Sequence, residues 1–249
     1  MNKFWTSIAG FAVVLLVGCG KDIDLEDLEK KTPEEIYTIG QKEMNERHYG
    51  AAVKVFDGLE RLHPYSKLVA NAQLRAGECN YNSKKYSEAS SSFEIFVKTH
   101  PIHEQVPYAI YMLGLINYEQ MPIVERDQDA TVESLQYLEE LCDRYPDCKY
   151  IKDAKEKIVK LREQLAGREV YVARYYQGKE NYAAAINRLN VVIEQYSDTI
   201  HAPEALHRLI ECYVAMGEIE EALLVFGVLK NNHPKSIWTG HASAILQKK

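Results

Sequence analysis

The stretch Tyr49–Pro64, YGAAVKVFDGLERLHP, decides the fold because its pattern returns along the chain. Residues 86–101, YSEASSSFEIFVKTHP, keep the tyrosine, alanine, phenylalanine and proline at identical offsets, 37 residues later. The same offsets recur from position 182, from position 219 and, more weakly, from position 131. Five copies in one frame predict a repeated structural unit. The frame residues are Tyr49, Ala52, Phe56 and Pro64; Tyr86, Ala89, Phe93 and Pro101; Thr131, Ser134, Leu138 and Pro146; Tyr182, Ala185, Leu189 and Ser197; and Ile219, Ala222, Phe226 and Pro234.

Stacked helix pairs account for this frame. The small residue lets two helices approach, the large residue four positions later lies on the same face, and proline stops the second helix. Gly40 and Gly77 each lie 24 residues before the proline of their copy and mark the partner helix, and Gly114 takes this place in the third copy if its loop is longer. The pattern resembles the tetratricopeptide repeat over nearly all of Pro33–His233. We therefore predict an all-α chain, a right-handed α-α superhelix of about five helix pairs, or about ten helices.

Two intervals are longer than the repeat period. The interval from Pro101 to Pro146 exceeds it by 8 residues, which we place in the segment Glu119–Asp129. The interval from Pro146 to Ser197 exceeds it by 14 residues. Residues 150–176 contain no helix breaker except Gly167, so we predict one long helix there. Its apolar and small residues recur at helical spacing: Ile151, Ala154, Ile158, Leu161, Leu165, Val172 and Tyr176.

The amino-terminal residues predict export and lipidation. Residues 1–18 carry one charge and an apolar run that is shorter than the roughly 20 residues of a membrane-spanning helix, as in a signal peptide. The sequence Leu16-Val17-Gly18-Cys19 resembles the bacterial lipobox, which implies cleavage before Cys19 and a lipid anchor on it; an ordinary signal peptide that contains a cysteine is the alternative. The resemblance also implies a membrane: the residue after the cysteine is Gly20 and not the aspartate associated with inner-membrane retention in some bacteria, which favours the outer membrane. Residues 19–31 are densely charged and suit a tether, and order is expected from Thr32, where Thr32-Pro33-Glu34-Glu35 starts a helix.

Charge and motifs argue against nucleic-acid binding and catalysis. Without residues 1–18 the chain has 29 basic and 36 acidic side chains, a net charge of −7, whereas nucleic-acid binding favours a basic surface. No phosphate loop, nucleophile motif or zinc-protease motif is present, so we predict neither catalytic residues nor a cofactor. Of the eight histidines, His100 and His103 are the densest cluster, but a His-Pro step recurs at residues 63–64 and 233–234. The recurrence shows that His100 occupies a regular position of the repeat, which needs no metal to explain it. We therefore predict no metal site.

The cysteines other than Cys19 fall into two groups. Cys79 and Cys212 share one repeat position and are expected to be core thiols. Cys142 and Cys148 flank a proline stop, where a short-loop disulfide and two separate thiols are both possible.

The first helix of each pair is expected to line a concave binding groove. Tyrosine, methionine and amide side chains suit a peptide groove because rigid aromatic rings bury area at low entropic cost. The alternative for each tyrosine is packing within the stack. Arg188, in the fourth copy, has a planar fork suited to carboxylates of a partner, or else to an internal salt bridge between the fourth and fifth repeats. The predicted groove residues are Tyr37, Met44, Asn45, Leu74, Glu78, Tyr81, Asn82, Tyr111 and Tyr118.

The whole arrangement resembles the BamD family. The most specific stretches are residues 32–37, residues 49–56 and residues 185–188. The resemblance implies a lipid-anchored periplasmic scaffold of the machinery that folds β-barrel proteins into the outer membrane. Repeats in residues 32–149 would bind unfolded outer-membrane β-barrel precursors, and residues 150–249, with Arg188, would dock on a periplasmic domain of BamA; other Bam lipoproteins are possible partners. Ser197 departs from the expected proline, and the alternative is another tetratricopeptide lipoprotein adaptor, such as a pilotin-like factor or an adaptor for cell-wall enzymes.

Overall fold

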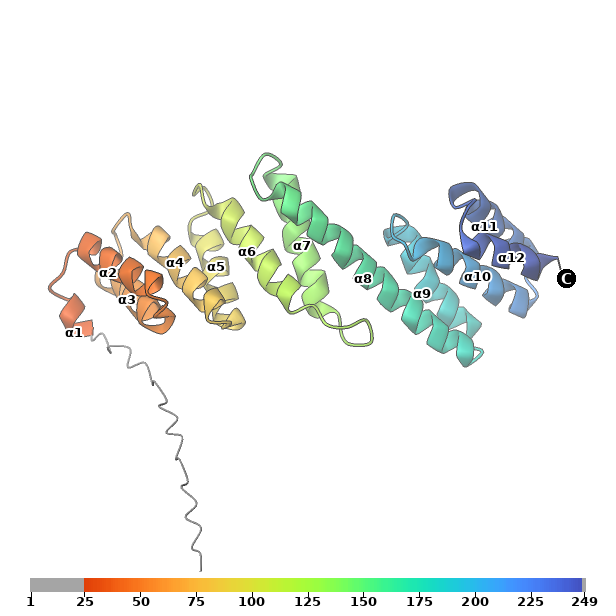
Figure 1. Ribbon diagram of the computed structural model, residues 1–249, viewed down its shortest axis with the longest axis horizontal. Coiled ribbons are helices and arrows are strands. Elements are labelled where there is room, and N and C mark those ends of the chain that lie inside the picture. The colour runs from red at the N-terminus through yellow and green to blue at the C-terminus, as the bar shows by residue number, and fades with distance from the viewer. Residues whose placement is uncertain (1–24, 248–249) are drawn as a thin grey trace, which may run out of the picture. The chain divides into compact units, whose positions relative to one another are not determined.

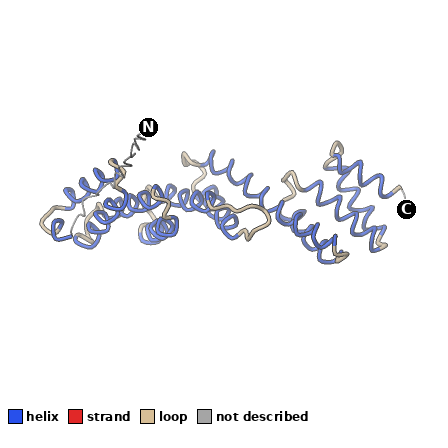
Figure 2. The backbone as a smooth tube through the Cα atoms, turned by 60° about the horizontal axis from the view of Figure 1, so that its bottom comes forward, coloured by secondary structure: helices blue, strands red, loops and turns tan. Residues whose placement is uncertain are grey.

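The computed structural model describes residues 25–247, which form twelve helices joined by loops, with no strand among them (Figure 2). This confirms the predicted all-α class. The helices are α1 (Leu25–Leu28), α2 (Pro33–Asn45), α3 (Tyr49–Leu62), α4 (Val69–Asn82), α5 (Tyr86–Thr99), α6 (Val106–Glu119), α7 (Asp129–Arg144), α8 (Ile151–Gly178), α9 (Tyr182–Gln195), α10 (Ala202–Met216), α11 (Ile219–Asn232) and α12 (Ile237–Leu246).

The second helix of each pair ends where the repeat frame predicts, and in four of the five pairs it begins at the first frame residue; α7 begins at Asp129, two residues before Thr131. Helices α3, α5, α9 and α11 start at the frame residues Tyr49, Tyr86, Tyr182 and Ile219 and are each 14 residues long. Each ends two residues before the frame proline. Helix α9 ends at the same point although Ser197 replaces the proline, because the amide of Tyr196 still closes the last turn on the carbonyl of Val192 at 2.9 Å.

The chain forms two compact units, one ending at Cys79 and one beginning at Asn80. In unit 1, α2 begins at Thr32, whose side chain and that of Glu35 form a reciprocal capping box. The core joins α2, α3 and the first turns of α4 around Phe56. It also includes Leu28 of α1, which is buried, so the packed core extends to residues before the expected start of order at Thr32.

Unit 2 contains the helix pairs α6–α7, α8–α9 and α10–α11, with α12 packed on α10 and α11. Helix α8 runs unbroken through Gly167 for 28 residues, which confirms the predicted long helix. Figure 1 shows α8 continuing from the α6–α7 pair to the α9–α10 region. The longer loop predicted before α7 is also present: its carbonyls at Pro122 and Val124 accept hydrogen bonds from α8.

Within residues 25–247, no helix combines the length and the apolar character that crossing a membrane requires. Cys19 and the expected signal peptide lie outside the described residues.

Candidate functional site

The predicted groove residues of unit 1 are mostly committed to the fold. Leu74 and Glu78 are buried, and Glu78 accepts a hydrogen bond from Arg75 at 2.6 Å. The ring of Tyr37 packs against Phe56, with 5.7 Å between ring centroids. Burial lowers the pKa of Arg75, but its hydrogen bonds with Glu78 and Tyr37 outweigh this effect and raise the pKa. Leu74 and Glu78 therefore offer little surface to a peptide.

The other two residues predicted in this part of the groove lie at the end of α2. Met44 is partly buried and packs against the core of unit 1, whereas Asn45 is exposed. Unit 1 thus presents a small, mainly polar part of the predicted groove.

Unit 2 brings several of the predicted tyrosines together. Tyr81 and Tyr86 both donate hydroxyl hydrogen bonds to the carboxylate of Glu119, the second at 2.8 Å. Tyr81 comes from the last turn of α4, Tyr86 from the start of α5 and Glu119 from the end of α6. One carboxylate therefore ties three helices, and Asn82 beside it is exposed.

A second carboxylate organises the rest of this face. Tyr111 donates to Oδ2 of Asp153 at 2.6 Å and stacks on Tyr150 at a centroid distance of 4.7 Å. Nζ of Lys157 binds both oxygens of Asp153 at 2.7 Å and lies 5.3 Å from the ring centroid of Tyr118. We call the whole set the tyrosine face: Tyr81, Tyr86, Tyr111, Tyr118 and Tyr150, with Glu119, Asp153 and Lys157.

The protonation states of the tyrosine face follow from these contacts. Burial and the hydrogen bond to Asp153 raise the pKa of Tyr111, and burial and the hydrogen bond to Glu119 raise the pKa of Tyr81. Burial raises the pKa of Asp153, but hydrogen bonds from Lys157 and Tyr111 outweigh it and lower the pKa. Near neutral pH the hydroxyls are therefore protonated donors, and the Asp153 carboxylate is charged.

Sequence reasoning found part of this face. It identified Tyr81, Tyr111 and Tyr118 but missed the roles of Asp153 and Lys157. Their spacing of four residues on a helix was a signal of an ion pair, but nothing in the sequence tied that pair to a tyrosine 42 residues away.

Arg188 lies on the exposed side of α9. Its Nη1 is 3.3 Å from Oε2 of Glu169 on α8, and about half of the Arg188 side chain is exposed. The internal salt bridge considered as the alternative is thus present, but it joins α8 to α9 within one helix pair rather than the fourth repeat to the fifth. The contact uses one nitrogen, so the rest of the fork can still bind a partner.

A polar network between α8 and α10 was not anticipated. The carboxylate of the buried Glu204 accepts hydrogen bonds from Arg174 and, at 2.7 Å, from Arg208. Arg174 and Arg208 also line a pocket of about 420 Å³ together with Gln177, Tyr182 and Glu211. The two guanidinium charges are offset by Glu204 and Glu211, which makes this network a structural link between repeats.

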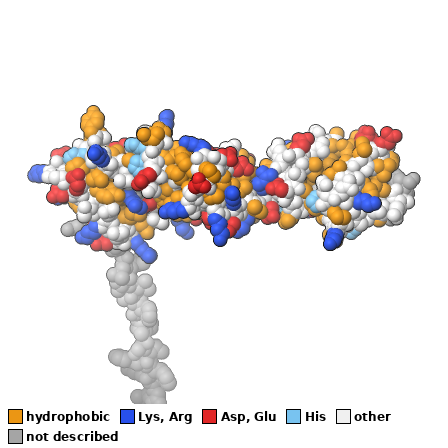
Figure 3. All heavy atoms as spheres, turned by 90° about the horizontal axis from the view of Figure 1, so that it is seen from above, with side chains coloured by type: hydrophobic (Ala, Val, Ile, Leu, Met, Phe, Trp, Pro, Cys, Tyr) orange, Lys and Arg blue, Asp and Glu red, His pale blue; other side chains and the backbone are white. Residues whose placement is uncertain are grey.

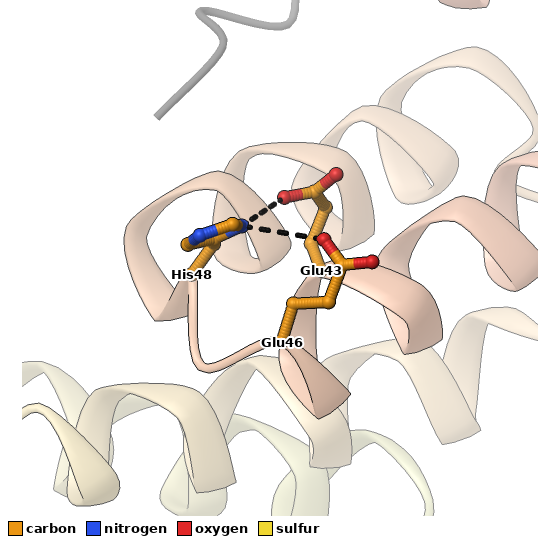
Figure 4. Close-up of side chains that lie close together, drawn as sticks. All are labelled: Glu43, Glu46 and His48. Atoms are coloured by element: carbon orange, nitrogen blue, oxygen red, sulfur yellow. Dashed lines mark hydrogen bonds and ion pairs between the residues drawn. The ribbon is translucent and has the colours of Figure 1, made fainter. Parts of the chain in front are cut away.

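One group in the described part of the chain, in unit 1, has the composition of a metal site. Glu43, Glu46 and His48 place their ligand atoms within 4.8 Å of one another at the turn between α2 and α3 (Figure 4). Nδ1 of His48 lies 3.0 Å from Glu43 and 3.6 Å from Glu46, so a single ring nitrogen serves both carboxylates. His48 and Glu46 are exposed, and the contacts are those of a polar cluster that closes the turn, with a hydrogen bond between His48 and Glu43.

The histidines and cysteines singled out in the sequence have structural surroundings. His100 and His103 contact the ring of the buried Phe96. Cys79 and Cys212 are buried, as expected for core thiols. Cys142 and Cys148 are separate, partly buried thiols, which decides between the two states left open by the sequence.

Comparisons with known proteins identify the family. A family model described as YfiO, outer membrane lipoprotein, matches residues 29–225. Outer membrane protein assembly factor BamD of Caulobacter vibrioides is 35% identical over 218 residues, covering 88% of this chain and 72% of that protein. BamD of Rickettsia prowazekii is 31% identical over 234 residues, covering 94% and 93% of the two chains.

Among solved structures, the TPR domain of P58(IPK) is 13% identical, with a TM-score of 0.47, and the match covers 90% of this chain and 57% of that one. The extent of the family match and the identity to assembly factors over most of both chains show the family. The chain belongs to the YfiO family of outer membrane lipoproteins, the family of outer membrane protein assembly factor BamD.

Proposed function

We propose that the protein is a lipid-anchored periplasmic scaffold of the β-barrel assembly machinery, held at the outer membrane through Cys19. It binds unfolded outer-membrane β-barrel precursors and the periplasmic domain of BamA, and it promotes barrel folding without catalysing a reaction. Family membership supports the general role, because the relatives are named as outer membrane protein assembly factors.

The tyrosine face is the observation that carries the precursor-binding proposal. Its rings are held by stacking and by carboxylate hydrogen bonds, so a peptide that packs on them immobilises few additional side chains. Tyr118 and Tyr86 are partly exposed and supply apolar contact area, and Lys157 supplies a positive charge beside Tyr118. An extended chain rich in aromatic residues fits such a surface.

The docking half is residues 150–249, where the half-exposed Arg188 offers guanidinium donors to a carboxylate on BamA. The precursor half is residues 32–149. The boundary between these halves lies inside unit 2, which begins at Asn80. The first two turns of α8 belong to both functions, because Asp153 and Lys157 complete the tyrosine face.

Two measurements test the proposal. Copurification from membranes is expected to yield an outer-membrane barrel protein with periplasmic domains as the main partner; a secretin or a cell-wall hydrolase in its place contradicts it. Titration with carboxy-terminal peptides of barrel precursors is expected to lose affinity by about 2 kcal/mol in the double variant Tyr111→Ala, Tyr118→Ala, with BamA binding retained. Loss of both activities together with a lower melting temperature would assign these tyrosines to the fold alone.

A further inference from the structure

The outward face of α11 is apolar. Leu223, Leu224 and Val228 are 53%, 73% and 43% exposed. The opposite side of the helix packs on α10 and α12 through the buried Ala222 and Leu229. Figure 3 shows apolar side chains on the surface at the carboxy-terminal end of unit 2, with acidic side chains beside them.

The repeat frame provides an internal comparison for this face. Leu224 lies two residues after the small frame residue, and the other four copies all have a polar residue at that position. Gly227 lies five residues after it, where the other copies also have only polar residues. The equivalents of Leu224 are Lys54, Ser91, Gln136 and Asn187, and those of Gly227 are Asp57, Glu94, Glu139 and Asn190. The fifth repeat is thus the only copy without a polar side chain at these two positions, whereas the positions of Leu223 and Val228 are apolar in some other copies as well, including the exposed Ile95. An apolar residue at position 224 is not needed on a helix face that contacts only solvent.

Gly227 has no explanation within the fold. A Cβ atom there would have nothing within 4 Å, in contrast to Gly40, whose place is fixed by Phe56. Glycine destabilises a helix interior relative to alanine, and here it leaves a gap between Leu223, Leu224 and Val228. A gap between apolar ridges lets the backbone or a large side chain of another molecule approach α11 closely.

The shape and charge of the face specify the occupant. The backbone N–H and C=O groups of a helix bond to one another, so α11 offers no free edge to which a strand could add. A partner must therefore bind α11 through its side chains. Leu224 and Val228 lie one helical turn apart and form an apolar ridge, with the gap at Gly227 beside it. The side-chain ridge of a second helix fits into such a groove. Exposed Glu218, Glu220 and Glu221 lie at the amino-terminal end of α11, whereas Lys230 lies at its other end.

We propose that this face of α11 is a docking site for an amphipathic helix of a partner protein, which packs an apolar seam over Gly227 and places basic residues beside Glu220 and Glu221. The site contains no residue of the tyrosine face and does not include Arg188. Because α11 lies within residues 150–249, the half proposed to dock on BamA, the inference adds a second contact surface to that half, and the peptide test below is read independently of BamA binding.

The test uses a synthetic amphipathic helix, held helical by a staple, with a leucine and alanine seam and lysine flanks. We expect it to bind the mature chain, and we expect Leu224→Lys and Gly227→Leu each to weaken binding by about tenfold or more. The matched controls Asn187→Lys, at the same repeat position in α9, and Gly50→Leu, at another open glycine, should leave the affinity within about twofold. Gly227→Ala should raise the melting temperature while weakening binding.

Several outcomes would overturn the proposal. Failure of the peptide to bind, or equal losses in the α11 variants and the controls, removes the docking site. Equal binding of a peptide with glutamate flanks removes the charge assignment. A lower melting temperature in Leu224→Lys and Gly227→Leu shows that the face belongs to the fold. Dimerisation of the chain in sedimentation that Leu224→Lys abolishes shows that the occupant is a second copy.

Discussion

A Cβ atom at position 40 would lie 2.5 Å from Cε1 of Phe56, so Gly40 and Phe56 are matched across the contact between α2 and α3. The third repeat repeats this relationship: a Cβ atom at Gly114 would lie 2.5 Å from the Leu138 side chain. Ser134 adds a hydrogen bond of 2.7 Å to the carbonyl of Gly114. These two helix pairs are thus closed by a missing side chain on one helix and a large one on the other.

Gly40→Ala is expected to destabilise the protein by about 1–3 kcal/mol, because the buried ring of Phe56 has to move for the methyl group to fit. Gly50→Ala is the matched control. Gly50 lies in α3 with nothing within 4 Å of its Cβ position, so alanine there should be neutral or stabilising by up to about 1 kcal/mol. Chemical denaturation of both variants checks the difference, and equal stability of the two would contradict the close contact.

Glu204→Gln is expected to lower stability at neutral pH by about 2 kcal/mol, because it removes the charged acceptor of Arg174 and Arg208. Burial raises the pKa of Glu204, but these hydrogen bonds outweigh it and hold the pKa below its ordinary value of 4.5. A lowered folded pKa gives stability that is complete above the unfolded pKa and is lost as the pH falls through the folded pKa. The stability difference between wild type and Glu204→Gln should therefore be constant near neutrality and shrink below about pH 4.5.

Thermal unfolding of both proteins over that pH range measures the effect. Glu220→Gln, an exposed first-turn residue of α11, serves as the control and should show a small difference at every pH. A Glu204→Gln curve parallel to that of the wild type at all pH values would exclude the linkage.

Much of the fold could be predicted because it depends on residues close together in sequence. The first frame residue, the small residue and the proline stop lie within 16 positions, so they indicate where α3, α5 and α11 begin and end, and α9 has the same bounds in the frame although Ser197 replaces the proline. The two ends of the fold were missed. The sequence LEDL at residues 25–28 reads as tether, yet Leu28 fills the core of unit 1, and α12 covers the last helix pair, which has no further repeat to pack on.

The binding faces could be predicted only in part, because their contacts join distant residues. The helix period places Tyr111 and Tyr118 on one face, but Asp153 reaches Tyr111 only because α8 packs on α7, which in turn packs on α6. Likewise Leu74 is on the predicted face of α4 and is nevertheless buried. A repeat pattern gives the side of a helix, and packing decides how much of that side reaches solvent.

The thiols are expected to react in two classes. Burial raises the pKa of Cys212 to about 11, and Cys79 is raised for the same reason, so both stay protonated and shielded at about pH 8. Cys142 and Cys148 are partly buried and should alkylate first. Mass spectrometry of the labelled peptides before and after unfolding measures both classes. Recovery of a peptide pair linked through Cys142 and Cys148 from the native protein would contradict the separate thiols.

Tyr111→Phe is expected to cost about 1 kcal/mol of stability, because it removes the hydroxyl that donates to Asp153 while keeping the ring stacked on Tyr150. Tyr118→Phe removes a hydroxyl that is not part of the Asp153 network and keeps the ring beside Lys157, so it should change stability by less than about 0.5 kcal/mol. Urea denaturation compares the two. A larger loss in Tyr118→Phe than in Tyr111→Phe would mean that Asp153 does not organise the face.

Two roles of Arg188, docking on a partner protein and pairing with Glu169 of α8, can be separated by mutation, because Glu169 can be replaced while Arg188 is kept. Arg188→Ala and Glu169→Gln both break the contact of 3.3 Å, and for a half-exposed ion pair each should cost less than about 1 kcal/mol of stability. If Arg188 docks on BamA, Arg188→Ala should weaken BamA binding by about tenfold or more, whereas Glu169→Gln should leave it unchanged or slightly stronger, since the guanidinium is then released for the partner. Binding measured at low and high salt should show the loss mainly at low salt, because surface ion pairs are screened. Equal weakening by both variants would mean instead that the α8–α9 pair supports the docking surface and that Arg188 does not touch the partner.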